Sequence, residues 1–350
     1  MAKKILKCAL LGCGYIADRH IQAFQDCENT EIVALCGRNP ERLKSLQEKY
    51  GIEKGYTDYH KLMEENPDLD MISNALPNSM HVSVTIELLE AGYNVLLEKP
   101  MAVNAEEGRA LVEAEKKAKG KLMIIQNQRF IPAAQYMRRM FKEGEFGEVY
   151  HIRTGWRRPL GMTPSGMDNI GGVMSDRSWY NSKAANGGVL RDLGVHLLDL
   201  AMFITDFPEI ESVSAASYRK FTASGPVDPE AAKDMSEDMC TALLKFKNGM
   251  SINMEVSFGT MISEEKLFTN IYGTRAGVER TGDELKLILH DPDYAYKVAY
   301  ANLKGEKEFK NCIHEFADCL VNDKPVPVRA EQALKVIEIL DMIYKETDDR

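Results

Sequence analysis

The sequence predicts an α/β protein of two domains, in which a parallel sheet comes first and an α+β domain on an open, mostly antiparallel sheet follows. Its length of 350 residues exceeds what one hydrophobic core usually supports. Over the first 125 residues, short apolar runs alternate with helical patterns, which indicates right-handed βαβ crossovers. Beyond about residue 126, strand-like runs follow one another instead. We therefore expect domains at residues 1–125 and 126–350, with a C-terminal helix that can pack back on the first domain.

The first domain is expected to alternate strands with helices. The strands are short apolar runs, at residues 7–11, 32–36, 71–75, 94–97 and 122–126. The helices are amphipathic patterns between them, near residues 16–26, 40–50, 58–65, 79–91 and 104–118. Two of these helices carry start signals. Asn39 is an N-cap followed by Pro40, and Asn104 with Glu107 resembles a capping box.

The second domain is expected to begin with a helix at 132–143 and a strand at 148–156. Residues 157–186 are polar and rich in Gly, Pro, Ser and Asn, so they form either a disordered loop or a lid over a site. A helix near 188–204 follows, and further helices at 308–321 and 331–346 close the chain. The turn Lys247-Asn248-Gly249 predicts a hairpin and therefore antiparallel pairing. The strand-like runs lie at 209–219, 238–247, 250–258, 267–273 and 285–290.

Charge and composition argue against several classes of function. A net charge of −9 is unfavourable for a nucleic-acid surface. No stretch approaches 18 uninterrupted apolar residues, and the short apolar start leads into a glycine motif, so we expect a cytoplasmic protein without a membrane span. The seven cysteines form no CxxC pair and show no zinc spacing with histidine, so we expect neither a metal site nor a structural disulfide.

A glycine motif at the end of the first strand predicts a dinucleotide cofactor. Gly12, Gly14 and Ala17 read GxGxxA between a strand and a helix. Gly12 allows the tight turn, Gly14 lets the backbone approach a pyrophosphate, and Ala17 keeps the helix close to the sheet. The helix N-terminus then offers free N–H groups to the phosphates. The first domain is therefore predicted to be a Rossmann domain that binds NADP or NAD.

The end of the second strand favours NADP over NAD. An acid at this point usually holds the ribose hydroxyls, but this chain has Gly37-Arg38-Asn39. Without a carboxylate a 2′-phosphate meets no repulsion, and Arg38 could pair with it in a bidentate way. Arg38 could equally stack on the adenine of NAD.

Two further segments follow strands at the edge where such sheets bind ligands. One runs from Leu76 to Asn78 and continues to His81, which is either a lining residue or a half-exposed helix histidine. The other is Glu98-Lys99-Pro100, where Lys99 could polarise a carbonyl or hold a hydroxyl, unless it is only a solvated lysine at a strand end. Glu98 could orient the cofactor, and Pro100 could fix the turn with a cis bond. The full cofactor-binding set is expected to be Gly12, Gly14, Tyr15, Ile16, Arg38, Leu76, Pro77, Asn78, His81, Glu98, Lys99 and Gln126.

A second motif, in the predicted helix near 188–204, supplies an acid–base pair. Asp192 and His196 stand four residues apart, on one helix face, and Asp199 follows three residues later. A histidine one turn from a carboxylate can accept a proton near neutral pH. Asp199 either fixes the imidazole tautomer or orients the helix. Gly194 costs about 1 kcal/mol relative to alanine in a helix, which suggests that something approaches the backbone there.

Together, GxGxxA at 12–17, Glu98-Lys99-Pro100 and the DxGxHxxD run at 192–199 resemble the Gfo/Idh/MocA oxidoreductases. The resemblance implies that Lys99 holds the reacting hydroxyl, that His196 is the general acid–base, and that Asp192 binds a neighbouring hydroxyl. It also implies hydride exchange between the nicotinamide and a ring carbon, and an open sheet that pairs subunits into homodimers or homotetramers. Gly37 departs from the family, whose NAD-using members generally keep an acid there.

The expected substrate is a mono- or disaccharide, another sugar derivative or a cyclitol. Tryptophan can lie against the apolar face of a sugar ring, and arginine can hold a phosphate or carboxylate. Aromatic residues could instead only anchor a solvated loop. Two other activities stay open: redox-neutral glycoside cleavage by transient oxidation, and a cofactor-sensing regulatory role without turnover. The expected substrate-binding residues are Lys99, Arg129, Trp156, Arg157, Arg158, Trp179, Asp192 and His196.

Overall fold

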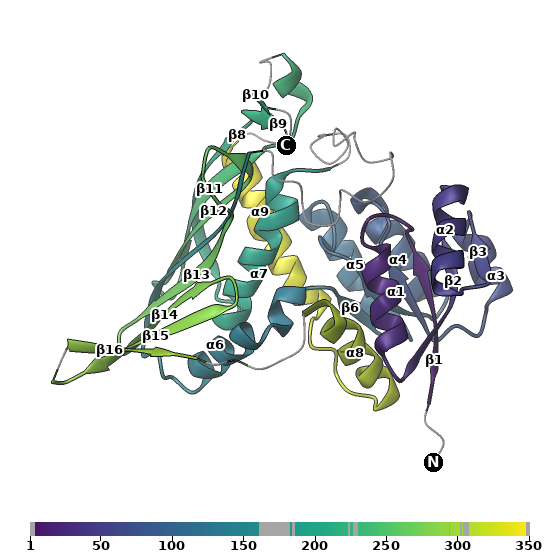
Figure 1. Ribbon diagram of the computed structural model, residues 1–350, viewed down its shortest axis with the longest axis horizontal. Helices are drawn as coiled ribbons and strands as arrows, with labels where there is room; N and C mark the ends of the chain where they lie inside the picture. The colour runs from purple at the N-terminus through teal and green to yellow at the C-terminus, as the bar shows by residue number, and fades with distance from the viewer. Residues whose placement is uncertain are drawn as a thin grey trace. The chain divides into compact units, whose positions relative to one another are not determined.

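The computed structural model describes residues 4–160, 183, 186–222, 225–226, 230–293, 295–301, 303 and 308–347. The chain divides into two compact units, one of residues 1–127 with 307–337 and one of residues 128–306 with 338–350 (Figure 1). Residues 307–337, which the sequence analysis placed in the second domain with a C-terminal helix that can pack back on the first, group with the first unit. Helix α8 (Glu308–Val321) packs there against α1 (Ala17–Asp26), and α9 (Ala330–Glu346) is divided between the units.

The first unit has the predicted parallel sheet. Its strands lie in the order β3-β2-β1-β4-β5-β6, so the order reverses between β1 and β4. Ligands of such sheets bind beside this reversal, at the carboxyl ends of the strands. The strands are β1 (Leu6–Leu11), β2 (Thr30–Cys36), β3 (Lys54–Tyr56), β4 (Met71–Asn74), β5 (Asn94–Leu97) and β6 (Leu122–Ile124).

The helices of this unit begin where their capping residues predict. The Asn39 side chain accepts a hydrogen bond from the Arg42 amide at the start of α2, and Asn104 accepts one from the Glu107 amide at the start of α5. Strand β3 was not predicted, because its three residues form no apolar run. The remaining helices here are α2 (Pro40–Tyr50), α3 (Tyr59–Glu65), α4 (His81–Glu90) and α5 (Ala105–Lys117).

The second unit is built on the predicted open, mostly antiparallel sheet. Its strand order is β16-β15-β14-β13-β7-β12-β11-β8, and β7 pairs with β12 in parallel while the other neighbours pair antiparallel. The predicted hairpin at Gly249 joins β11 to β12. The strands are β7 (Val149–Pro159), β8 (Ile210–Tyr218), β11 (Met239–Phe246), β12 (Ser251–Thr260), β13 (Lys266–Gly273), β14 (Ala276–Thr281), β15 (Glu284–Asp291) and β16 (Ala295–Tyr300).

Helices α6 (Pro132–Lys142) and α7 (Val195–Ile204) lie on one face of this sheet (Figure 1). The helix expected over 188–204 is not uniform, because a π-helical turn at Leu190–Gly194 precedes α7. Such turns are rare and are frequent at functional sites. Across the described residues, we find no helix that is both long and apolar enough to cross a membrane.

Candidate active site

The turn between β1 and α1 has the geometry that a dinucleotide needs. Gly12 has a φ of +108°, and a Cβ at this position would lie 2.1 Å from the Ala75 carbonyl oxygen. A Cβ on Gly14 would meet no atom within 4 Å, so space is open above the backbone where a pyrophosphate could approach. Ala17 is fully buried at the first turn of α1. Tyr15 and Ile16 complete the turn and are both half-buried.

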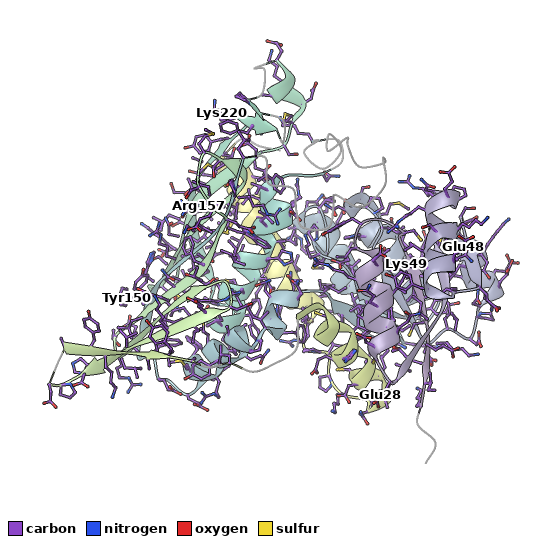
Figure 2. All side chains as sticks on the ribbon, viewed as in Figure 1. Glu28, Glu48, Lys49, Tyr150, Arg157 and Lys220 are labelled. Atoms are coloured by element: carbon purple, nitrogen blue, oxygen red, sulfur yellow. The ribbon has the colours of Figure 1, made fainter. Side chains whose placement is uncertain are left out.

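At the end of β2, Arg38 is exposed and Gly37 is buried. The neighbouring charges belong to a cluster that joins α1 to α2: Asp18 accepts hydrogen bonds from Arg42 (2.5 Å), Lys49 (2.6 Å; labelled in Figure 2) and Tyr50 (2.7 Å). Although burial raises the pKa of Asp18, the bonds from Lys49, Tyr50 and Arg42 lower it below its ordinary value. Sequence reasoning did not single out this cluster.

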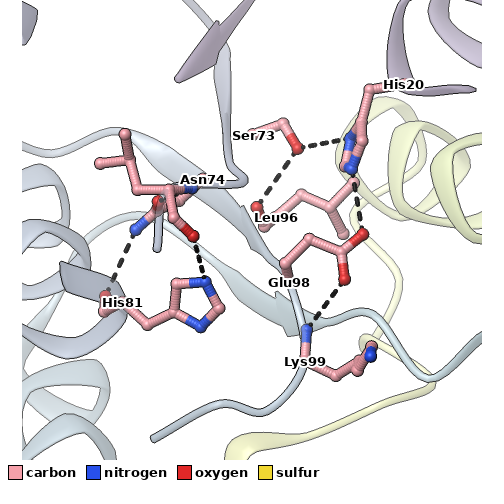
Figure 3. Close-up of polar contacts among 8 residues, drawn as sticks. His20, Ser73, Asn74, His81, Leu96, Glu98 and Lys99 are labelled. Atoms are coloured by element: carbon pink, nitrogen blue, oxygen red, sulfur yellow. Dashed lines mark hydrogen bonds and ion pairs between the residues drawn. The ribbon is translucent and has the colours of Figure 1, made fainter. Parts of the chain in front are cut away.

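Glu98 is held by a buried histidine that the sequence motifs did not reveal (Figure 3). The His20 Nε2 atom lies 3.0 Å from Glu98 Oε1, and its Nδ1 atom lies 3.0 Å from the Ser73 hydroxyl oxygen. The other carboxylate oxygen of Glu98 accepts the backbone N–H of Lys99 at 3.0 Å. Burial raises the pKa of Glu98, but the hydrogen bond and charge of His20 bring it below the ordinary value. Glu98 is therefore an ionised group that fixes the backbone of Lys99.

His81 is buried and contacts two backbone carbonyl groups, so it is not the half-exposed helix residue that the sequence also allowed. Its Nδ1 atom lies 2.7 Å from the Pro100 carbonyl oxygen, and its Nε2 atom lies 2.8 Å from the Leu76 carbonyl oxygen. It therefore joins the segments that follow β4 and β5, and burial lowers its pKa despite these two contacts. The Lys99–Pro100 bond is cis, as the sequence suggested.

At the end of β6, Gln126 supplies a buried acceptor. The side chain is 1% exposed, and its Oε1 atom has no hydrogen-bond partner among the described residues. An unpaired buried oxygen is costly unless a donor reaches it, and a carboxamide N–H₂ such as that of nicotinamide is a suitable donor. Leu76 and Asn78 are half-buried and Pro77 is exposed along the same edge. The residues of this edge thus fit a dinucleotide.

The second unit carries Asp192 and His196, the pair that the sequence analysis expected to serve in acid–base chemistry. His196 is 8% exposed in the first turn of α7, and its ring centre lies 6.2 Å from that of Trp156 on β7. Asp192 is half-buried in the π-helical turn before it. A Cβ on Gly194 would lie 3.2 Å from Leu190, in the same turn, so the approaching group is the turn's own side chain.

Two buried carboxylates hold this helix. Glu237 accepts the backbone N–H of Leu190 and the Tyr344 hydroxyl, each at 2.9 Å, and burial raises its pKa. Asp199 accepts two hydrogen bonds from Arg129, at 2.8 and 2.7 Å. Asp199 therefore anchors the helix through Arg129, which was one of the two expectations for it. Glu237 was missed because it stands far from the motif in the sequence.

The arginines and tryptophans expected to bind substrate differ in their surroundings. Trp156 and Arg158 lie together: both side chains donate to Glu265 Oε1, at 2.7 and 3.2 Å. Arg157 is the intervening residue of the strand and so points to the opposite face, where its Nε atom lies 3.6 Å from Glu255 Oε1. Arg129 has only 1% of its surface exposed, so its guanidinium serves Asp199 rather than a ligand. Trp179 lies outside the described residues.

The parallel sheet with its glycine turn, followed by an α+β unit on an open, mostly antiparallel sheet, is the architecture of a dinucleotide-dependent oxidoreductase. Two family models match the chain: the NAD-binding Rossmann fold of an oxidoreductase family at residues 6–126, and the C-terminal alpha/beta domain of the same family at residues 138–350. The chain belongs to the Gfo/Idh/MocA oxidoreductase family.

Several relatives act on sugars. D-glucoside 3-dehydrogenase of Escherichia coli K12 is 30% identical over 79% of this chain and 77% of its own length. D-apiose dehydrogenase of Paraburkholderia graminis is 29% identical over 97% of this chain and 87% of its own. A solved levoglucosan dehydrogenase, in complex with NADH and levoglucosan, superposes with a TM-score of 0.82 at 21% identity, covering 99% of this chain and 98% of that one.

Proposed function

We propose that this protein is an NAD(P)-dependent dehydrogenase or reductase that acts on a CH–OH or ketone carbon of a sugar, a sugar derivative or a cyclitol. The observation that carries the proposal is His196, held beside the Trp156 ring by a helix with two buried anchors. The named activities of the relatives support the sugar class. When bound, the nicotinamide supplies the hydride acceptor or donor for this carbon.

In this proposal both Lys99 and His196 act on the reacting oxygen of the substrate, each in a different role. The Lys99 ammonium donates a hydrogen bond to that oxygen and stabilises the negative charge that develops on it. His196 takes the hydroxyl proton in oxidation and returns it in reduction. Asp192 binds a neighbouring hydroxyl, and Glu98 keeps the Lys99 backbone in place. A protein that only sensed the cofactor would have no use for this acid–base pair.

The cofactor is proposed to be NADP, with NAD as the alternative. The end of β2 has no acid that would repel a 2′-phosphate, and Arg38 is exposed beside it. The remaining cofactor contacts are those expected from the sequence, with His81 acting through the carbonyl groups that it holds.

On the substrate side, Trp156 offers an aromatic face for a sugar ring. The guanidinium carbon of Arg158 lies 5.0 Å from the centre of the Trp156 ring. Both are fixed by Glu265, so they would meet a substrate already oriented. We leave Arg157 and Arg129 out of the substrate set for the reasons given above.

The open sheet is proposed to pair copies of the chain. The face away from α7 exposes large apolar side chains on strands that are far apart in the sequence. Among them, Tyr218 and Leu243 are 40% and 37% exposed, and Tyr296, Val298 and Tyr300 on β16 are 60%, 47% and 73% exposed. Burial of this face in a homodimer or homotetramer would remove it from water.

The test is to incubate the purified protein with NAD or NADP and a panel of sugars and cyclitols, and to follow absorbance at 340 nm. Sustained formation of reduced cofactor with one ring class is the expected result. His196→Asn should lose most of this rate, and the control is His60→Asn, an exposed histidine on α3, which should leave the rate unchanged. Cofactor binding without reduction across the whole panel would contradict the proposal and favour redox-neutral cleavage or sensing.

A further inference from the structure

Gly37, at the end of β2, packs closely against Cys13 of the glycine turn. A Cβ placed on Gly37 would lie 2.6 Å from the Cβ and 2.7 Å from the Sγ of Cys13. Carbon atoms in contact prefer about 3.5–4.0 Å, so a side chain at position 37 would force Cys13 and the backbone of the glycine turn to shift. Cys13 stands between the two glycines of the motif, is 9% exposed, and its Sγ lies 3.5 Å from the Cys36 carbonyl oxygen.

Position 37 matters because the residue at the end of the second strand meets the adenosine ribose in this type of domain. A carboxylate there accepts hydrogen bonds from the ribose hydroxyls, and it repels a 2′-phosphate. We propose that Cys13 is a specificity-determining residue: its side chain occupies the space of a residue-37 side chain, keeps a carboxylate away from the ribose, and so admits a 2′-phosphate. This inference rests on the proposed use of NAD(P).

The surrounding charges agree with a phosphate. Burial raises the pKa of the Cys13 thiol to about 12, so the group that replaces the acid is neutral at physiological pH. The positive charge of Arg42 acts on that thiol, and Arg38 is exposed next to Gly37. Asp18 is the nearby acid that α1 contributes, and its carboxylate already accepts hydrogen bonds from Arg42, Lys49 and Tyr50. A 2′-phosphate at this place would therefore lie near the cations Arg38 and Arg42, while the Asp18 carboxylate is already paired.

The contact distances give a test with an internal control. Removing only the sulfur, in Cys13→Ala, leaves the Cβ that lies 2.6 Å from a Cβ at position 37. Removing the whole side chain, in Cys13→Gly, leaves the Cys13 backbone nitrogen at 3.4 Å as the nearest of the three atoms, which is ordinary contact. An aspartate at position 37 should therefore be accepted by the Cys13→Gly protein and not by the Cys13→Ala protein.

The experiment measures the Kd of NADPH and of NADH by fluorescence titration of the full chain, together with thermal unfolding, for five proteins: wild type, Cys13→Gly, Gly37→Asp, Cys13→Ala/Gly37→Asp and Cys13→Gly/Gly37→Asp. We expect Cys13→Gly alone to keep the wild-type ratio of the two constants. Cys13→Gly/Gly37→Asp should shift that ratio toward NADH by at least about tenfold, because a carboxylate beside the 2′-phosphate costs more than about 1.4 kcal/mol. The two proteins that combine an aspartate at position 37 with a Cβ at position 13 should lose stability and bind both cofactors more weakly.

Three results would overturn the inference. If Gly37→Asp alone folds normally and shifts the ratio as far as Cys13→Gly/Gly37→Asp does, Cys13 excludes nothing. If Cys13→Gly/Gly37→Asp keeps the wild-type ratio, position 37 does not meet the ribose. If wild type binds neither cofactor, the proposed function fails and the inference with it, whereas the first two results leave NAD(P) binding intact.

Discussion

Replacing Arg129 by methionine should destabilise the second unit by about 3–5 kcal/mol. The side chains of Arg129 and Asp199 are 2% and 1% exposed, and two hydrogen bonds of 2.8 and 2.7 Å join them in a bidentate pair. Methionine fills most of the space but leaves the Asp199 carboxylate buried without its cation. The rings of Phe203 and Phe207, centred 5.2 and 5.0 Å from the guanidinium carbon, would lose their cation contacts as well.

The loss is measured as the free energy of unfolding in urea, followed by the fluorescence of the chain's two tryptophans, Trp156 and Trp179. Arg139→Met is the matched control, because its pair with Glu143 is half exposed on both sides and should contribute at most about 0.5 kcal/mol. Arg129→Met/Asp199→Leu should recover part of the loss, since no buried charge then remains. A change of less than about 1 kcal/mol in Arg129→Met, or full additivity in the double variant, would refute the reasoning.

Three further predictions concern His196, Glu98 and Glu237. His196→Asn should lower turnover by about 10² or more with little change in the Kd of the cofactor; equal turnover would remove His196 from the mechanism. The folded-state pKa of Glu98 lies below its ordinary value of 4.5, so its contribution to stability is present above pH 4.5 and is lost as pH falls through the folded value. The stability advantage of wild type over Glu98→Gln, measured by urea titration, should therefore shrink between pH 6 and pH 3, and a constant difference would contradict the assignment. Burial raises the pKa of Glu237, so Glu237→Gln should be tolerated or stabilising at pH 8. Glu237→Leu removes the acceptor oxygen and should lower the free energy of unfolding at that pH, measured by thermal or urea unfolding, by about 1–3 kcal/mol. Equal losses in the two variants would show that the acceptor oxygen does not matter.

The architecture could be predicted because its signals are local. Strand segments buried on both faces, such as Cys8–Leu11, read as continuous apolar runs, and caps such as Asn39 and Asn104 mark helix starts within three residues. Strands β14 and β16 lack such runs: β14 opens with Ala-Gly and carries two charges, and β16 is largely exposed. The π-helical turn was missed because a one-residue change in helical period leaves no mark in an apolar pattern.

The residues of the candidate site likewise divide into those that a local sequence signal reveals and those that only the fold brings together. Gly12, Lys99 and His196 stand in contiguous motifs, so the sequence could name them. His20 and Glu237 act on those motifs from 78 and 47 residues away, and only the fold brings the partners together. Arg157 shows the opposite error: it is adjacent to Trp156 in sequence, but successive residues of a strand point to opposite faces. The contact between Cys13 and position 37 likewise exists only once β1 and β2 are paired.

The most direct test of the central claim is to follow a label from substrate to cofactor. A sugar or cyclitol that is turned over in the panel is prepared with deuterium on its carbinol carbon and incubated with the wild-type protein and the oxidised cofactor. The account predicts that the deuterium appears at C4 of the free reduced nicotinamide, one atom for each ketone formed, and that His196→Asn slows this transfer. Deuterium that stays in the carbohydrate product, with no reduced cofactor released, would contradict it.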